Sequence, residues 1–343
     1  MKIAIHPSEI SYSNKWIEYC QIKNLSFCIV NCYRSDIIDQ IADCDILMWH
    51  YHHKDSRDMI VAHQLLSAIE NAGKTVYPDS NTRWFFDDKV GQKYLLEAIG
   101  APLVPSYVFY SKKDALSWVK QTSFPKVFKL RKGSGSANVR LVRNSKEAFR
   151  IVFKAFRSGF RQYDPVEGLL ERWRIFRRGA SDLTDLFEGI GRFIVKTRFE
   201  KIAGRERGYV YFQDFIDGCA FDVRTTVIGD KCYAFKRMVR KNDFRASGSH
   251  DDIFSPEEIP LEIIQMSFQI SDKLKLQSVA FDFLITKENQ PLITEMSYAF
   301  GWEEGDADAY WDKDLNYNNK PFNPFGEMVE TVIRQAENKT GKR

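Results

Sequence analysis

Short apolar runs alternate with amphipathic stretches through the first 80 residues of the chain. The stretch at residues 56–72 has apolar side chains at helical spacing, and Gly73 follows it where a helix would end. Strands and helices that alternate in this way are typical of a small parallel α/β domain. The expected strands are residues 2–5, 26–30, 45–49 and 75–77, and the expected helices are residues 11–23, 35–42 and 56–72.

The middle of the chain predicts a second set of elements around a loop of glycine and serine. A helix is expected at residues 87–99, because Gly100 and Pro102 follow it. An apolar strand at residues 125–130 leads into the loop at residues 132–138. The next 60 residues are expected to be helical and basic, since residues 150–207 contain 14 Lys and Arg against eight Asp and Glu.

The last third of the chain consists mainly of expected strands. Two of them are separated by Gly229-Asp230, a two-residue hairpin signal that places Asp222 opposite Arg237. The expected strands are residues 209–216, 221–228, 231–239, 279–286 and 291–296, and the expected helices are residues 261–275 and 325–338. We therefore predict a mixed α/β protein.

Composition and charge restrict the class of function. A net charge of +4 is too small to predict nucleic-acid binding. No stretch approaches the ~18 apolar residues of a membrane span. The six cysteines form no CxxC pair, which favours a reduced, cytoplasmic protein over a disulfide framework. The first α/β domain has no GxGxxG turn and is not predicted to bind a dinucleotide.

The loop at residues 132–138 has the composition of a phosphate-binding loop. Glycine allows the backbone N–H groups to approach phosphate oxygens closely, and serine adds further donors. Lys129 on the preceding strand adds positive charge, and strand periodicity puts it on the face opposite Phe128. A tight hairpin with solvated lysines is the alternative interpretation. The loop is not a Walker loop, because GxxxxGK[ST] is absent.

Two carboxylates lie within apolar strands near the end of the chain. Asp282 and Glu295 would each be costly to bury without a cation, and Ser297 follows on the second of the two strands. A Mg²⁺ ion with oxygen ligands and bound phosphates would neutralise them. Salt bridges to Arg or Lys are the alternative interpretation of the same pattern.

Basic residues gather on the predicted hairpin and after it. Arg224 shares a face with Asp222, and Lys236-Arg237 lie on the second strand, followed by Arg245. Arginines that converge in this way can bind a transferring phosphoryl group. A simple ion pair between Asp222 and Arg237 would explain part of the pattern equally well.

These pieces, in this order, resemble the ATP-grasp superfamily, which includes D-alanine–D-alanine ligases, bacterial glutathione synthetase and ligases that add glutamate to protein C-termini. The resemblance covers about residues 79–330 and depends on the order and spacing of the pieces. They are Asp88-Lys89, the strand and glycine loop after residue 125, Gln213-Asp214-Phe215-Ile216, Asp222-Val223-Arg224, Lys236-Arg237, Asp243-Phe244-Arg245, and Asp282 with Glu295 and Ser297.

The resemblance implies a role for each matching residue. ATP would be bound by Lys89, Lys129, Lys236, Gly133, Ser134, Gly135, Ser136, Ala137, Gln213, Asp214, Phe215, Ile216 and Asp217. Arg224, Arg237 and Arg245 would be catalytic, and Asp282, Glu295 and Ser297 would bind Mg²⁺. Family members usually have Asn where Ser297 stands, and Arg245-Ala246-Ser247 replaces the more usual Arg-x-Asn.

The implied fold is an ATP-grasp fold that follows a Rossmann-like pre-ATP-grasp domain. The implied domains are residues 1–80, a central subdomain at 81–208 with the glycine loop and the basic insertion, and a C-terminal subdomain at 209–343 with the metal site. ATP would lie between the last two. The residues from 295 to 301, with Tyr310-Trp311-Asp312, also resemble a bacterial subgroup associated with surface-polysaccharide synthesis.

The implied reaction joins a carboxylate to an amine or a thiol through an acyl phosphate, at the expense of ATP. The partners would be a small-molecule or glycan carboxylate and an amine acceptor. Two alternatives remain open from the sequence: a kinase that phosphorylates a sugar or small-molecule hydroxyl, and an ATP-binding assembly protein with reduced catalysis.

Overall fold

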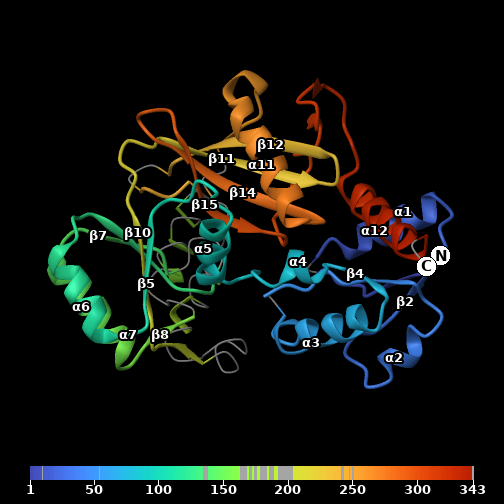
Figure 1. The fold of residues 1–343 in the computed structure, drawn as a ribbon, viewed down its shortest axis with the longest axis horizontal. Coiled ribbons are helices and arrows are strands. Elements are labelled where there is room, and N and C mark those ends of the chain that lie inside the picture. Colours follow the sequence, from blue (N-terminus) through green and yellow to red (C-terminus); the bar gives the residue numbers. More distant parts are fainter. Residues whose placement is uncertain are drawn as a thin grey trace. The chain divides into compact units, whose positions relative to one another are not determined.

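The chain forms two compact units, which are described separately. The first unit combines residues 1–86 with residues 219–343, and the second comprises residues 87–218. The computed structural model (Figure 1) describes all residues except 10, 54, 134–137, 163–167, 170–171, 174–175, 178–183, 185–188, 192–203, 241–242, 247, 249–250 and 342–343. None of the described helices is long and apolar enough to cross a membrane.

The first unit begins with a parallel sheet of four strands in the order β2-β1-β3-β4. The strands are β1 (Ile3–Ile5), β2 (Phe27–Ile29), β3 (Ile46–Met48) and β4 (Thr75–Tyr77), and the helices are α1 (Ser13–Ile22), α2 (Ile37–Gln40), α3 (Asp58–Asn71) and α4 (Ser80–Arg83). Three of the strands are buried on both faces, which explains their continuous apolar sequence.

Helices cover both faces of this parallel sheet. Ile3 and Met48 pack with α1 and with the last helix of the chain, α12 (Pro324–Thr340), which lies beside α1 in Figure 1. Ala4 and Leu47 point the other way and pack against α2 and α3. The expected parallel α/β arrangement of the first 80 residues is confirmed.

The rest of the first unit is built on an antiparallel sheet in the order β15-β14-β11-β12-β16-β17, with β13 paired to β12. Its elements are β11 (Phe221–Ile228), β12 (Lys231–Met238), β13 (Asp252–Ile253), a 3-10 turn (Pro256–Glu258), α11 (Leu261–Leu274), β14 (Ser278–Ile285), β15 (Pro291–Ser297), β16 (Tyr310–Asp312) and β17 (Tyr317–Asn318). Gly229 has φ 57° in the β11–β12 turn, as the two-residue hairpin requires.

The two faces of the antiparallel sheet have different surroundings. Helix α11 packs on one face, where Ser267 Oγ lies 2.8 Å from Thr225 Oγ1. On the other face Ile228, Tyr233 and Phe235 join the apolar cluster around α12. Strand alternation puts the candidate catalytic residues Asp222 and Arg224 on this second face, beyond the end of the apolar cluster.

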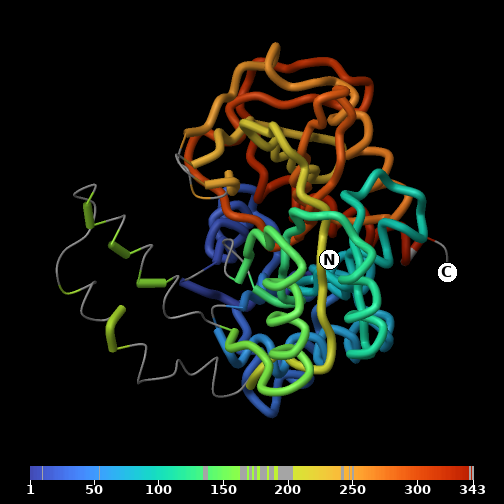
Figure 2. Tube along the Cα trace, turned by 90° about the vertical axis from the view of Figure 1, so that its left-hand side faces the viewer, coloured from blue at the N-terminus to red at the C-terminus, as the bar shows by residue number. Residues whose placement is uncertain are grey.

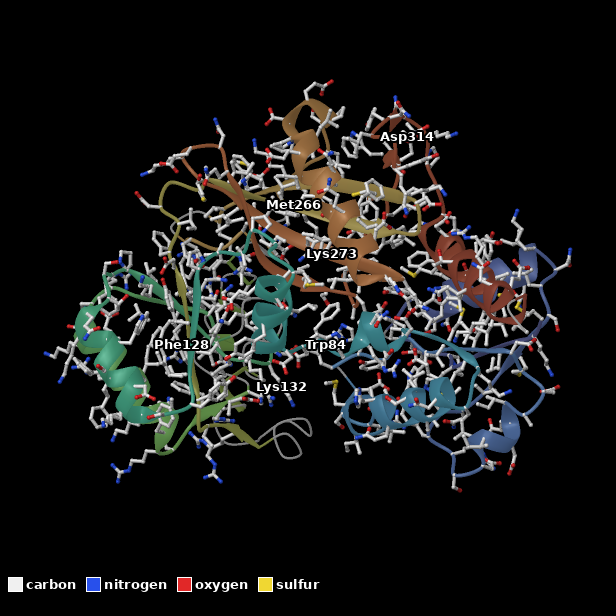
Figure 3. All side chains as sticks on the ribbon, viewed as in Figure 1. Trp84, Phe128, Lys132, Met266, Lys273 and Asp314 are labelled. Atoms are coloured by element: carbon white, nitrogen blue, oxygen red, sulfur yellow. The ribbon has the colours of Figure 1, made fainter. Side chains whose placement is uncertain are left out.

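The second unit contains an antiparallel sheet in the order β5-β10-β6-β7 and a small β8–β9 pair. Its elements are α5 (Lys89–Ala98), β5 (Ser106–Phe109), α6 (Lys112–Gln121), β6 (Lys126–Lys129), β7 (Arg140–Val142), α7 (Ser145–Phe156), β8 (Phe160–Arg161), β9 (Arg205–Glu206) and β10 (Val210–Asp214). Helices α6 and α7 lie side by side (Figures 1 and 2) and cover one face of the sheet. Phe128, labelled in Figure 3, belongs to the apolar layer beneath them.

Several elements differ from the expectation. Strand β10 pairs with β5 and β6 of the second unit, and the observed boundary between the units follows it at residues 218 and 219. The proposed division into three domains is not tested by this and remains a prediction. The basic stretch after α7 contains the β8–β9 pair, and most of its remaining residues lie outside the described part of the chain.

Asp58 at the start of α3 predicts a pH-dependent stability. It is 5 % exposed and accepts hydrogen bonds from Tyr33 Oη (2.6 Å) and the His52 backbone (2.7 Å), and burial raises its pKa to about 6. The folded chain therefore holds this proton more firmly than the unfolded chain does. The parent should lose about 2 kcal/mol of unfolding free energy relative to Asp58→Asn as pH rises from 4 to 7. Urea titrations at several pH values measure this, with exposed Asp39→Asn as the control. A difference that is independent of pH contradicts the prediction.

Candidate functional site

Asp282 on β14 is the centre of a network of ion pairs. Arg224 donates to both of its oxygens, from Nε at 2.8 Å and from Nη2 at 2.9 Å. Arg237 donates to Asp222 from Nε and Nη2, each at 2.7 Å, and its Nη2 also lies 3.0 Å from Asp282 Oδ1. The two carboxylates and the two guanidinium groups thus form one connected cluster.

The register of three strands produces this network. Asp222 on β11 is directly opposite Arg237 on β12, and Arg224 on β11 is directly opposite Asp282 on β14. Residues two apart on a strand share a face, so all four side chains lie on the same side of the sheet. The predicted pairing of Asp222 with Arg237 is confirmed.

The charges of this network are set by its burial and by the arginines. Asp222 and Arg237 are only 8 % and 5 % exposed. Burial disfavours the charged form of Asp282, but Arg224 and Arg237 outweigh it and hold the pKa of Asp282 well below its usual range. Burial raises the pKa of Asp222, so Asp282 is the carboxylate whose charge is held more firmly.

Glu295 and Ser297 extend the same row of polar residues on β15. Glu295 is directly opposite Asp282, where a β-bulge shifts the register of the two strands, and Ser297 lies two residues further on. Two carboxylates and a hydroxyl are oxygen ligands, which suit Mg²⁺ bound together with phosphates. Among the described residues no three His, Cys, Asp or Glu side chains gather in a metal-binding group, so further ligands would come from phosphates or water.

Two other predicted residues lie apart from this row. Lys236 is opposite Val223, so it projects from the other face of the sheet from Arg237, and it forms an ion pair with Glu258 at 2.6 Å. Arg245, in the segment after β12, forms an ion pair with Asp243 at 2.7 Å. The structure therefore does not bring Lys236 together with Arg224 and Arg237.

In the second unit, residues just before and at the start of α5 hold the beginning of the glycine loop. The side chain of Lys89 donates to the carbonyl of Gly133 at 2.5 Å, and the N–H of Gly133 donates to Asp87 at 2.6 Å. Asp88 caps α5 by accepting from the backbone of Val90 and Gly91. The loop residues Ser134, Gly135, Ser136 and Ala137 lie outside the described residues.

A second polar group lies on the face of the second unit's sheet that α6 and α7 do not cover. Lys129 is 8 % exposed and directly opposite Tyr211. Gln213 is 2 % exposed, and its amide donates to Ser106 Oγ at 3.1 Å. Phe215, Ile216 and Asp217 follow β10, and their exposure increases from half-buried at Phe215 to exposed at Asp217.

Sequence reasoning missed several of the polar contacts in this unit. Asp214 forms an ion pair with Lys126 at 2.5 Å, on the face toward α6, and Ser106 orients Gln213. Asp87 was not selected, although it has φ 52° and precedes Asp88-Lys89. The run Asp87-Asp88-Lys89 at a helix start was the only local signal.

Comparisons with known proteins agree on the fold. Residues 189–314 match the RimK-like ATP-grasp domain. This match extends through the antiparallel sheet and includes Arg224, Arg237, Asp282 and Glu295. No curated protein sequence matches the chain.

Solved structures with ATP-grasp names match nearly the whole chain. D-alanine–D-alanine ligase from Bacillus anthracis, complexed with ATP, is 14 % identical with a TM-score of 0.55 and 98 % of each chain covered. The RimK domain protein ATP-grasp from Sphaerobacter thermophilus is 13 % identical with a TM-score of 0.53, covering 97 % of this chain and 100 % of that one. N5-carboxyaminoimidazole ribonucleotide synthetase from Thermotoga maritima is 15 % identical with a TM-score of 0.57, covering 97 % and 75 %. The chain has an ATP-grasp fold and contains a RimK-like ATP-grasp domain.

Proposed function

We propose that this ATP-grasp protein is a ligase that joins a carboxylate to an amine, or to a thiol, at the expense of ATP. The observation that carries the proposal is the row of charges on one face of the antiparallel sheet. Glu295, Asp282 and Arg224 lie directly opposite one another on three adjacent strands, and Arg237 contacts Asp282 from a fourth. Carboxylates for a metal and guanidinium groups for phosphate are the groups that phosphoryl transfer needs.

Each group in this row has a proposed role. The oxygens of Asp282, Glu295 and Ser297 would hold Mg²⁺, which when bound supplies charge neutralisation at the ATP phosphates. Arg224 and Arg237 would stabilise the negative charge that develops on the transferring phosphoryl group. Arg245 is assigned the same role from the resemblance alone, and in the structure it is paired with Asp243.

The second unit would bind the nucleotide. Lys89 and Lys129 would contact phosphates, and the loop of residues 133–137 would close over them. Lys89 already anchors the first glycine of that loop, and this contact supports its role. Gln213 and the backbone of residues 214–216 would contact adenine, with Asp217 near the ribose. Lys236 was assigned to the nucleotide by sequence, but its pairing with Glu258 gives no support to this.

The proposed chemistry has two steps. A carboxylate oxygen of the substrate attacks the γ-phosphorus of ATP, so that an acyl phosphate forms and ADP leaves. The nitrogen of a neutral amine then attacks the acyl carbon, phosphate leaves, and the amine loses a proton as the amide forms. A side-chain nucleophile is not required, because positioning and charge neutralisation suffice.

The identity of the substrates is a finer proposal. The named structural relatives include a ligase for D-alanine and a synthetase for a carboxyaminoimidazole ribonucleotide, and both names refer to small molecules. A uronic acid or another glycan carboxylate is proposed from the residues that resemble the surface-polysaccharide subgroup. A cytoplasmic location is part of the same proposal, since the six cysteines are unpaired and ATP is required.

Binding of ATP with Mg²⁺ provides the first test. A ligand that binds only the folded chain stabilises it by mass action, by about 2.7 kcal/mol at 100 times its Kd. Saturating ATP with Mg²⁺ should therefore raise the melting temperature, and AMP at the same concentration is the control. If calorimetry detects no binding and the melting temperature does not change, the chain is not an ATP-dependent enzyme.

Product analysis then separates the ligase from the two alternatives. A screen of amino acids and uronic acids, read by release of phosphate, should find a carboxylate and an amine that together stimulate ATP turnover. An amide with free phosphate supports the ligase. A stable phosphorylated product instead identifies a kinase, and ATP binding without any turnover identifies an ATP-binding assembly protein.

A further inference from the structure

Two cysteine sulfurs approach each other within the N-terminal sheet. Cys28 lies in β2 and Cys44 lies two residues before β3, sixteen positions later, and their Sγ atoms are 3.4 Å apart. Both side chains pack in the apolar layer between the sheet and helices α2 and α3. A disulfide has an S–S length of about 2.05 Å, so a small rotation of the side chains would bring the sulfurs to bonding distance.

The two thiols differ in access to solvent. Cys44 is 2 % exposed, whereas Cys28 is only half-buried, on the edge strand of the sheet. Burial, together with the contact to Cys28, raises the pKa of Cys44 to about 12. Cys28 is therefore the sulfur that an oxidant in solution reaches first, and Cys44 is placed to attack it from inside.

We propose that Cys28 and Cys44 form a reversible intramolecular disulfide and are a redox modification site of this protein. The oxidant would be a low-molecular-weight disulfide such as glutathione disulfide. The reduced pair is the resting state in a reducing compartment, where free thiols are the rule. This proposal does not depend on the ligase activity.

The reaction is a double exchange. The thiolate of Cys28 attacks one sulfur of glutathione disulfide, and one glutathione thiolate leaves. The thiolate of Cys44 then attacks Cys28 in the mixed disulfide, so that the protein disulfide forms and a second glutathione thiolate leaves. The two cysteines lose two electrons and two protons in total, and glutathione disulfide is reduced to two glutathione molecules.

The bond would fix the segment that carries one wall of a cavity. A cavity of about 590 Å³ opens at the carboxyl ends of β1 and β2, and the loops that follow these strands and β3 line it. Five of its lining residues lie between the two cysteines: Ile29, Val30, Asn31, Tyr33 and Gln40. Oxidation would tie together both ends of this wall, including α2, and so restrict its motion.

The test uses the full chain in buffers with increasing ratios of glutathione disulfide to glutathione. Samples are quenched with acid, free thiols are alkylated, and tryptic peptides are analysed by mass spectrometry. A link between the peptides of residues 24–34 and 35–54 is expected, together with a rise in melting temperature of about 5 °C. Reduction with dithiothreitol should reverse both changes.

The controls identify the bonded sulfurs. Cys28 and Cys32 fall in the same tryptic peptide, so fragment spectra must place the link at Cys28. Cys28→Ser should abolish both the link and the shift in melting temperature, whereas Cys219→Ser, which is also only part-buried, should leave both unchanged. The proposal is overturned if excess glutathione disulfide yields only mixed disulfides or no linked peptide, or if the link survives in Cys28→Ser.

Discussion

Replacing Glu295 by Gln should reduce ATP turnover by on the order of 10² or more without unfolding the protein. Glu295 is opposite Asp282 in the sheet, and we propose that it is one of two carboxylates that hold Mg²⁺. Gln has the same shape but no charge, so the loss is confined to the neutralisation of phosphate charge in the transition state. The measurement is steady-state turnover at saturating ATP and Mg²⁺, with far-UV circular dichroism and melting temperature as checks of the fold.

A matched control exists on the same hairpin. Glu288 is exposed in the turn between β14 and β15, so Glu288→Gln makes the same chemical change away from the row of charges. It should leave turnover near the parent value. Turnover that stays unchanged in Glu295→Gln would show that Glu295 is structural, and the proposed metal site would then be wrong.

The sequence predicted pairings that are local along the chain and missed those between distant segments. The turn Gly229-Asp230 fixed the register of β11 and β12, and therefore placed Asp222 opposite Arg237. The pairing of Arg224 with Asp282 joins strands separated by α11, and no short-range pattern encodes it. For this reason the metal and salt-bridge interpretations of Asp282 could not be separated from the sequence, and the arginines that neutralise it were seen only in the structure.

The same reason explains the elements that were missed. Strand β5 is four residues long and follows two prolines, and its partner β10 is about 100 residues away. The contact of Gln213 with Ser106 depends on that pairing. Strands β16 and β17 lie in an aromatic and acidic stretch without clear alternation, and β16 is held by pairing with β12. The fold family was nevertheless predictable, because the order of several motifs is preserved along the chain.

The largest effect on stability is expected from Arg237→Met. Arg237 is 5 % exposed and neutralises Asp222, which is 8 % exposed, while Asp282 keeps Arg224 as a second partner. Removal of the guanidinium leaves the Asp222 carboxylate buried without its main cation. Loss of one partner of a buried ion pair typically costs about 3–5 kcal/mol, although replacement of both partners by apolar residues is often neutral. Urea titration at pH 7 measures the change in the unfolding free energy of the first unit.

Two further variants separate charge burial from packing. Lys236→Met changes the neighbouring residue on the same strand, whose ion pair with Glu258 is more exposed, and should cost no more than about 1 kcal/mol. The double variant Asp222→Leu with Arg237→Met removes both buried charges and should recover most of the stability that Arg237→Met loses. The Arg237→Met variant should also become relatively more stable as the pH is lowered, because protonation removes the unpaired charge of Asp222. If the double variant is as unstable as the single one at every pH, packing rather than charge burial is the contribution of Arg237.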